Sequence, residues 1–361
     1  MSRRHRLRRK DIRKRRTFFI IGMFAITFLF ASGYAAFSTN LNINAKGNLK
    51  QNLITVNKLK QSVVTTGDGL YTDPVETNRY VYKGANPNNY ITIGNEEYRI
   101  MAIEPDGTLK VVRNESIGEM VWDPGEETAI EGVTEENSLT GTRYSNESID
   151  FCYAGSSYFG CNSWGSSTTT LDSNGVNVTI MPREVGSTTY NLPTTEAYIN
   201  TYLNTTYLNN LLSNIDINKR AYIIDHTYNI GTVKNESGQT LATDITQEKT
   251  YKWRGKVGLM TATDYVKGSN NSACTSVREY SNTSGCYDNS TTHNYLAKSY
   301  YQWIMSPYSD SGSYSVWYAN STGKISNSST DCFIDVHPVL YLSSNIQLTG
   351  EGTQSTPYEI A

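Results

Sequence analysis

The sequence has little histidine, little charge and none of the short motifs that mark common catalytic and metal sites. Four of its 361 residues are His, and 18% are charged. No Cys-x-x-Cys, His-Glu-x-x-His or Gly-x-Ser-x-Gly motif is present. These absences argue against a zinc finger, a zinc-dependent protease and a hydrolase of the nucleophile-elbow type. We therefore predict no catalytic residue, no metal ligand and no cofactor; calcium is an option that no motif supports.

The N-terminal region contains a long apolar run behind a cluster of positive charge. Residues 1–16 hold ten Lys or Arg and one acid, Asp11. The run from Phe18 to Phe37 then reaches about 20 residues, which is enough to span a bilayer. Positive charge stays on the cytoplasmic side of a membrane. We predict a basic cytoplasmic tail over 1–16, a transmembrane or signal helix over 17–37, and the rest of the chain outside.

Two outcomes of this leader stay open. The helix is either retained, which anchors the protein in the cell membrane, or cut near Ala35, which secretes it. Small residues at Gly33 and Ala35 fit the preference of a signal peptidase.

The part of the chain beyond the basic tail is acidic. The whole sequence has 32 basic and 34 acidic residues, so removing ten and one leaves 22 and 33, a net charge of −11. A phosphate-binding surface needs clustered Lys and Arg, so we predict no nucleic-acid partner. We assign residues 38–66 to a linker or first strand and 67–361 to one extracellular domain.

Short apolar segments separated by turn residues dominate this domain. Three strands are predicted at 90–93, 98–103 and 108–112, because Gly94-Asn95 and Pro105-Asp106-Gly107 between them favour tight turns. A helix is predicted over 192–215 from its apolar spacing. Further expected elements are a strand at 221–233, a strand leading into a helix capped by Thr261 or Thr263 at 256–266, a helix leading into a strand at 294–307, and strands at 314–320 and 335–343. The pattern predicts an α+β fold with mostly antiparallel sheet and few short helices.

Five cysteines lie in the predicted extracellular part. Outside the cell, close spacing favours disulfides, and we predict the local pairs Cys152–Cys161 and Cys274–Cys286. The alternative is that all five are reduced. If the two local pairs form, Cys332 is the cysteine left over, and we expect it to be an inert buried thiol.

Residues 306–323 combine aromatic rings with small polar residues in the mixture that antibody binding loops use. Aromatic faces also stack on sugar rings, while Asp and Asn bond hydroxyl groups. The alternative is a simple hairpin with one face in the core, because alternation sends Trp317 and Tyr318 to opposite sides. The predicted ligand-binding residues are Tyr308, Asp310, Tyr314, Trp317, Tyr318 and Asn320.

Two resemblances extend this interpretation. The stretch ASGYAAFSTNLNINAKGN resembles the leader of Gram-positive surface proteins, including biofilm-fibre subunits. Four segments, YRI…DGTLKVVRNESI, KVGLMTATDY, WIMSP and HPVLYL, resemble a family of extracellular bacterial surface domains. This chain has His337 where that family usually has Arg. By analogy, the resemblance implies a C-type-lectin-like fold, as in formylglycine-generating enzymes and variable bacterial surface binders.

Three functions follow as hypotheses. The first is an exported module that recognises a glycan, peptide or protein without catalysis. The second is a structural subunit of a surface fibre or matrix, which the leader favours. The third is an exported enzyme of unrecognised mechanism. Fold alone does not choose among them.

Overall fold

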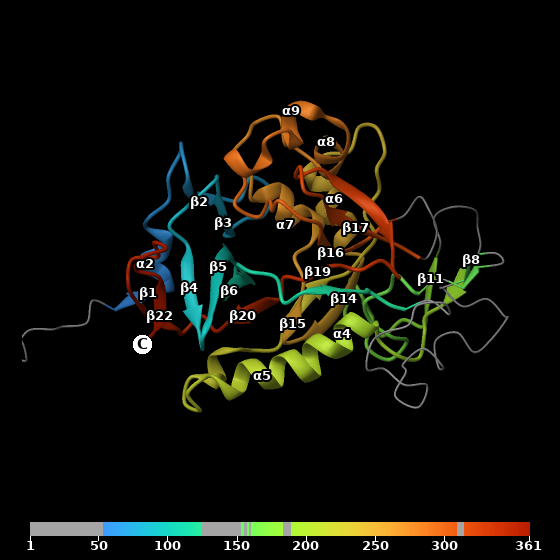
Figure 1. Ribbon diagram of the computed structural model, residues 1–361, viewed down its shortest axis with the longest axis horizontal. Helices are drawn as coiled ribbons and strands as arrows, with labels where there is room; N and C mark the ends of the chain where they lie inside the picture. The colour runs from blue at the N-terminus through green and yellow to red at the C-terminus, as the bar shows by residue number, and fades with distance from the viewer. Residues whose placement is uncertain (1–52, 125–152, 155–156, 159, 183–188, 309–313) are drawn as a thin grey trace, which may run out of the picture. The chain divides into compact units, whose positions relative to one another are not determined.

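The computed structural model describes residues 53–124, 153–154, 157–158, 160–182, 189–308 and 314–361. Residues from Leu53 to Ala361 form one compact unit. As predicted, it is an α+β structure made mostly of sheet, with few short helices (Figure 1). The predicted helix over 17–37 lies outside the described residues. Within the described ranges, no helix is long and apolar enough to cross a bilayer.

The largest sheet has ten strands, and its main path runs in the order β1-β21-β22-β4-β5-β6-β20-β15, with β3 joining β5 and β2 joining β3. Its strands are β1 (Ile54–Thr55), β2 (Gly69–Thr72), β3 (Tyr80–Lys83), β4 (Tyr90–Ile93), β5 (Glu96–Ile103), β6 (Leu109–Arg113), β15 (Val257–Gly258), β20 (Val339–Leu342), β21 (Gln347–Thr349) and β22 (Tyr358–Ile360).

A five-stranded sheet runs in the order β18-β17-β16-β19-β7, and smaller sheets complete the unit. The strands of the five-stranded sheet are β7 (Glu119–Met120), β16 (Gln302–Pro307), β17 (Ser315–Ala319), β18 (Ile325–Ser329) and β19 (Ile334–Asp335). The smaller sheets are β10 (Leu171–Asp172) with β14 (Tyr251–Gly255) and β13 (His226–Asn229), β11 (Ile180–Pro182) with β12 (Thr189–Asn191), and β8 (Tyr153–Ala154) with β9 (Ser157–Tyr158). Among the described strand pairs, β22–β4 and β16–β19 alone are parallel.

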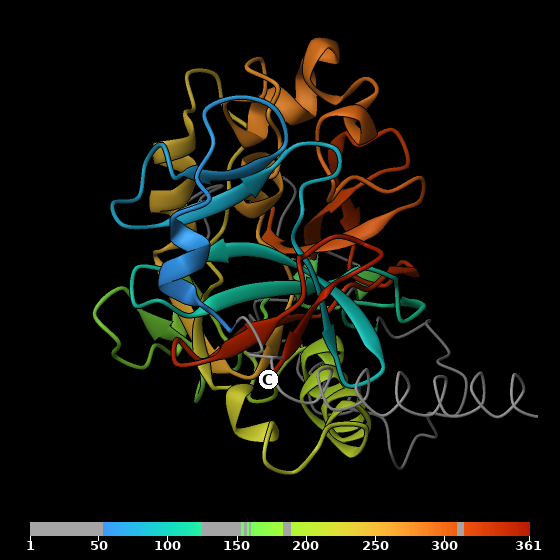
Figure 2. The same ribbon diagram turned by 90° about the vertical axis from the view of Figure 1, so that its left-hand side faces the viewer.

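The helices are short and lie on opposite sides of the sheets. Both views show α6–α9 clustered on one side and the helix containing α4 and α5 on the other (Figures 1 and 2). Their bounds are α2 (Val56–Lys60), α4 (Tyr198–Tyr202), α5 (Leu208–Ser213), α6 (Leu241–Glu248), α7 (Ala262–Lys267), α8 (Val277–Asn282) and α9 (Ser284–Tyr287). A π-helical turn, Leu203–Tyr207, joins α4 to α5, and 3₁₀ turns occupy Arg220–Tyr222 and Ser290–Thr292.

The predicted three-strand meander is confirmed as β4, β5 and β6. Tyr90 pairs with Arg99 and Ile100 with Val111, both antiparallel. Gly94 and Gly107, one in each connecting turn, have φ of +62° and +86°. Glycine adopts this left-handed region without the steric cost that a Cβ brings. Local turn chemistry therefore fixes this part of the sheet.

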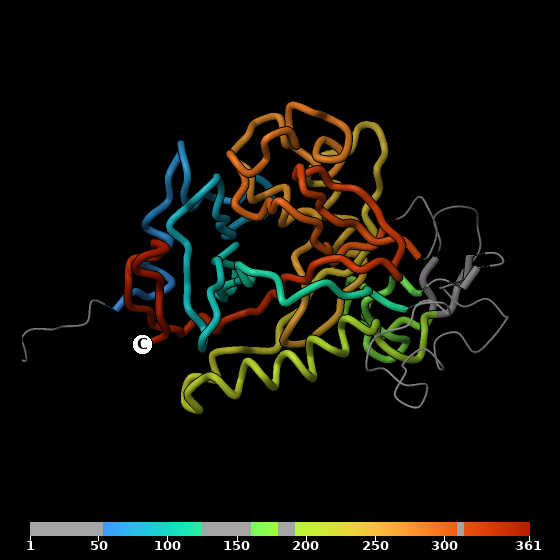
Figure 3. The backbone as a smooth tube through the Cα atoms, in the orientation of Figure 1, coloured from blue at the N-terminus to red at the C-terminus, as the bar shows by residue number. Residues whose placement is uncertain are grey.

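Both ends of the compact unit meet in the same sheet. Ile54 in β1 pairs with Leu348 in β21, and the backbone trace shows the first and last segments side by side (Figure 3). Val56 and Leu59 of α2 are buried in the core. Residues 54–60, which the sequence places in a linker or first strand, therefore contribute a strand and a helix to the fold.

Four tryptophan rings from separate parts of the chain contact one another in the core. Trp122 contacts Trp164 and Trp303 edge to face, with ring centroids 5.3 and 6.0 Å apart. Trp164 contacts Trp253 of β14 at 5.8 Å in the same way. Edge-to-face aromatic pairs contribute about 0.5–1.5 kcal/mol each beyond the burial of their surface. These rings link the five-stranded sheet to the three-stranded one.

Candidate functional site

A cavity formed by described residues lies between the β2–β3 hairpin and helices α6 and α7. Its volume is about 780 Å³, within the range of about 300–1,000 Å³ typical of small-ligand sites. Eight of the eighteen lining residues have neutral polar side chains: Thr65, Thr66, Thr240, Ser269, Asn270, Asn271, Ser272 and Thr275. The remaining lining side chains include an aromatic ring, aliphatic groups and two cations: Tyr71, Pro74, Val75, Leu241, Ala242, Val266, Lys83 and Lys267. The wall therefore offers hydrogen-bonding groups side by side with apolar surface.

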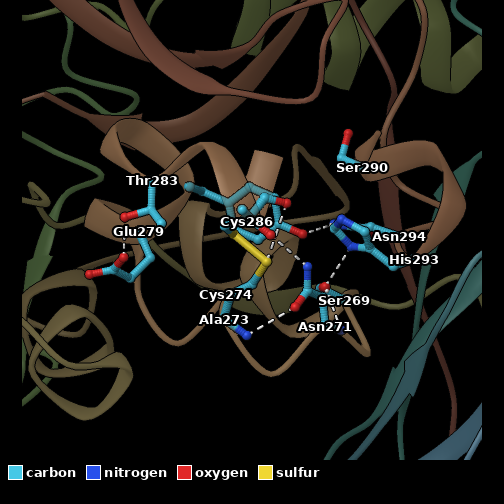
Figure 4. The surroundings of a disulfide bond; sticks show 12 residues. Ser269, Asn271, Ala273, Cys274, Glu279, Thr283, Cys286, Ser290, His293 and Asn294 are labelled. Atoms are coloured by element: carbon cyan, nitrogen blue, oxygen red, sulfur yellow. Dashed lines mark hydrogen bonds between the residues drawn. A yellow bond between two sulfur atoms is a disulfide. The ribbon is translucent and has the colours of Figure 1, made fainter. Parts of the chain in front are cut away.

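A disulfide holds one wall of this cavity. Cys274, a lining residue, is bonded to Cys286 with their Cα atoms 5.0 Å apart, which confirms the predicted pair. Figure 4 shows the bond beside Asn271, whose side-chain Nδ2 donates to the carbonyl of Gly285 at 2.9 Å and whose Oδ1 accepts from the Ala273 amide at 3.0 Å. The loop is therefore fastened to α9 by a covalent bond and by hydrogen bonds.

Ser269 and His293 form a pair at the edge of the same wall. Ser269 Oγ lies 2.9 Å from His293 Nδ1 and also accepts the amide of Asn271 (Figure 4). Burial lowers the pKa of His293, so its imidazole is neutral near pH 7. Among the described residues, no carboxylate bonds to this ring, so the third member of a catalytic triad is not part of the arrangement. The pair closes the turn that carries Asn271.

Lys267, at the end of α7, is held by buried carboxylates behind the cavity. Its Nζ lies 2.7 Å from Asp73 and 2.5 Å from Glu76, and its side chain is 3% exposed. Arg79 bonds to the same Asp73 at 2.9 Å. Burial disfavours the charge of Asp73, but Lys267 and Arg79 outweigh burial and lower the pKa of Asp73 to about 2. The positive charge of Lys267 is therefore fully compensated within the protein.

The same network continues to the helix start of α7. Asp264 bonds to Arg79 at 3.2 Å and to Lys110 of β6 at 2.5 Å. Burial opposes its charge, yet Lys110 and Arg79 hold the pKa of Asp264 well below its ordinary value. Asp264 also closes a capping box with Thr261, one of the two residues predicted to cap this helix. These contacts fix α7 against the large sheet and so position one side of the cavity.

Lys83 is the cavity cation without such compensation. It is half-buried at the end of β3, and its ammonium lies 5.6 Å from the ring centroid of Tyr71. No ion pair to Lys83 occurs among the described residues. Burial lowers the pKa of Lys83; Asp73 opposes this and Lys267 adds to it.

The structure corrects the placement of Trp317 in a binding surface. Trp317 is 0% exposed in β17, and its indole nitrogen donates to the carbonyl of Val233 at 3.1 Å. Tyr308 is 9% exposed and packs edge to face against it at 4.6 Å. Strand β17 lies between β16 and β18 with buried residues on both faces, so neither face of the indole is available for stacking on a sugar.

The other described residues of that predicted surface do not line the cavity between the β2–β3 hairpin and helices α6 and α7. Tyr314 and Tyr318 are half-buried, and Tyr318 contacts the exposed Tyr301 edge to face at 5.5 Å. Asn320 is half-buried and accepts the amides of Thr322 and Lys324, which is the role of a turn residue. Asp310 lies outside the described residues.

The structure also places Cys161, Cys332 and His337. Cys161 is buried, and its predicted partner Cys152 lies outside the described residues. Cys332 is exposed and free, which corrects the expectation of a buried thiol, because it lies in the turn between β18 and β19. His337 is buried between the carbonyl of Arg113 and the hydroxyl of Tyr300, and burial lowers its pKa to about 3. Within the described ranges, no group of His, Cys, Asp or Glu could hold a metal ion.

Cys274 is the one lining residue of the cavity to which the sequence assigns a role. Its close spacing to Cys286 was the usable signal. The other lining residues come from segments 65–83 and 240–275, which the chain separates by more than 150 residues. The scattered Thr, Ser and Asn of these segments form no sequence motif that could identify them as lining residues.

Comparison with known proteins gives no relative for this arrangement: the chain matches no family model, no curated protein and no solved structure.

Proposed function

We propose that the compact unit is an exported ligand-recognition module without catalysis, and that its ligand binds in the cavity between the β2–β3 hairpin and helices α6 and α7. The observation that carries the proposal is this cavity of about 780 Å³ with a wall rich in hydroxyl and amide groups. Such groups exchange hydrogen bonds with a polar ligand, and the apolar side chains beside them exclude water around it.

The rigidity of the walls supports the same proposal. The disulfide at Cys274 and the ion pairs of Lys267 hold two of the lining segments in place before any ligand arrives. A preformed site loses less conformational entropy on binding than a loose one. Among glycan, peptide and protein ligands, a glycan fits this lining best.

We also propose the finer aspects of the fold and location. The four segments that resemble extracellular surface domains support a C-type-lectin-like relationship for residues 67–361. The apolar run with its basic flank supports a transmembrane or signal helix over 17–37, with the compact unit at the cell surface or secreted.

The test is a glycan and peptide array probed with the full chain in detergent, with and without calcium. We expect saturable binding that Ala242→Trp abolishes, because Ala242 is an exposed lining residue at the start of α6 and an indole there fills the cavity mouth. Thr246→Trp is the matched control, since Thr246 is exposed on the same helix and does not line the cavity. A folded protein with no hit, or a hit that Ala242→Trp leaves unchanged, would reject the proposal.

A further inference from the structure

The charges around the cavity leave one cation without a partner. Lys267 has two carboxylates within 2.7 Å, whereas Lys83 has no ion pair among the described residues. A half-buried ammonium has lost part of its hydration, and that loss has a free-energy cost unless an opposite charge replaces the water. The ring of Tyr71 offers a partial substitute at 5.6 Å.

The nearby carboxylates are already engaged with other groups. Asp73 bonds to Arg79 and Lys267. Asp68 accepts the amide of Asn86 at 2.8 Å and the side-chain amide of Asn270 at 3.0 Å. Repulsion from Lys267 adds to the effect of burial in lowering the pKa of Lys83. Lys83 is therefore the lining residue at which a negatively charged ligand group gains the most favourable electrostatic energy on binding.

The rest of the wall identifies the body of the ligand. The wall that contains Lys83 also presents the side chains of Asn270, Ser272 and Thr275, together with the ring of Tyr71. These neutral donors and acceptors match sugar hydroxyls. We propose, resting on the function proposed above, that the cavity binds an acidic carbohydrate, a glycan whose carboxylate pairs with Lys83 while its hydroxyl groups bond to the amides and hydroxyls of the wall.

The acidic character of the chain does not oppose this pairing at short range. Residues 17–361 carry a net charge of −11. At physiological ionic strength the Debye length is about 8 Å, so distant carboxylates are screened and the local contact with Lys83 dominates. The net charge slows the approach of an anion, and that effect weakens as salt is added.

The experiment compares carboxylated and neutral glycans on the full chain in detergent. The probes are a galacturonate oligosaccharide, a sialylated oligosaccharide, and the carboxyl-reduced form of the first. We expect at least one carboxylated probe to bind. Its neutral counterpart should bind at least about 10-fold more weakly, because a charge-assisted hydrogen bond in a half-buried site contributes at least that factor to affinity. Lys83→Gln should weaken the carboxylated probe to the level of the neutral one. Lys83→Arg, which keeps the charge, should stay within about 3-fold of wild type.

Each contrary result shows which claim has failed: the carboxylate pairing, the carbohydrate assignment or the recognition function itself. Equal binding of neutral and carboxylated glycans, lost in Ala242→Trp and unaffected by Lys83→Gln, overturns the carboxylate pairing and leaves the recognition function standing. Binding of acidic peptides without any glycan overturns the carbohydrate assignment alone. No binding of any probe by the folded protein overturns both. An unchanged thermal midpoint for Lys83→Gln and Lys83→Arg shows that the variants fold.

Discussion

Two buried carboxylates on neighbouring helices have opposite electrostatic surroundings. Asp264 on α7 lies between Arg79 and Lys110, and its pKa is held well below the ordinary value. Asp244 on α6 is 0% exposed and accepts the amide of Val277, at the start of α8, at 2.8 Å. Burial raises the pKa of Asp244 to about 7; the Val277 amide opposes this and Glu248 adds to it. The two residues therefore affect the pH dependence of stability in opposite directions.

The first prediction at this scale concerns Asp244→Asn. Ionising an acid whose pKa is raised in the folded state costs free energy. The contribution of Asp244 to wild-type stability therefore falls as pH rises from about 4 to about 7 and then levels off. Asparagine keeps an acceptor for Val277 and carries no charge. We expect the free energy of unfolding at pH 8 to rise by about 1–3 kcal/mol, and to change little at pH 4. Urea denaturation at the two pH values measures it.

Asp264→Asn is the matched control, because the chemical change is the same and the surroundings are reversed. Removing its charge leaves Lys110 buried without its partner, which costs about 3–5 kcal/mol at pH 8. If both variants shift stability in the same direction at pH 8, the electrostatic account of the two sites is wrong.

Whether an aromatic residue binds a ligand or fills the core depends on what covers it. Trp317 and Tyr71 both lie in short strands. Trp317 has strands on either side and is 0% exposed, whereas Tyr71 lies in β2, off the main path of the ten-stranded sheet, and lines a cavity. Sequence alternation separates the two faces of a strand and does not say whether both are covered. The predicted surface at 306–323 failed at Trp317 for this reason.

At the scale of elements, predictions held where the signals were local. Thr261 begins α7 as expected, because its hydroxyl and the carboxylate of Asp264 three residues later satisfy backbone amides. The predicted helix at the start of 294–307 is wrong. There the Tyr295 amide donates to the carbonyl of Gly84, and the side chain of Asn294 donates to the carbonyl of Tyr265. Long-range bonds replaced the helical ones.

The helix predicted over 192–215 is confirmed in type and differs in detail. It begins at Tyr198, not at residue 192, and contains the π-helical turn at Leu203–Tyr207. Within that turn, the side chain of Asn204 accepts the amide of Val257 at 3.0 Å and donates to its carbonyl at 2.9 Å. A side chain that pairs with the end of a β-strand is a tertiary contact that helical periodicity does not contain.

The Cys274–Cys286 disulfide leads to a prediction about the free energy of unfolding. Cys274 and Cys286 are 12 residues apart, so the bond removes loop entropy from the unfolded chain worth about 3 kcal/mol. Replacing both by Ala should lower the free energy of unfolding by roughly that amount in urea. It should also weaken ligand binding, because Cys274 lines the cavity.

Cys332→Ala is the control for this change, because Cys332 is exposed and free. We expect its effect on stability to stay within about 0.5 kcal/mol. A double variant as stable as wild type would show that the loop is held by Asn271 and its hydrogen bonds without help from the disulfide.

For the whole molecule, the distribution of charge predicts topology. Ten cations precede the apolar run, and the remainder of the chain is acidic. In intact cells, we expect added protease to remove an epitope tag placed at Ala361 and to leave a tag at residue 2 protected if the helix is retained. If the leader is cut, N-terminal sequencing of the secreted protein should begin near Ala36. Replacing the ten cations by Gln should reduce correct orientation. Protection of both tags in wild-type cells would contradict export.

The sequence by itself determined the α+β class, the β4–β6 meander, the start of α7 and the Cys274–Cys286 pair. Each of these depends on residues within about a dozen positions of one another, where turn preferences, capping and loop entropy act directly. Three features required the tertiary structure: Trp317 is core, Lys83 has no ion pair among the described residues while Lys267 has two, and segments 65–83 and 240–275 enclose a cavity. Burial and charge pairing are properties of surroundings that distant segments create, and no local pattern records them.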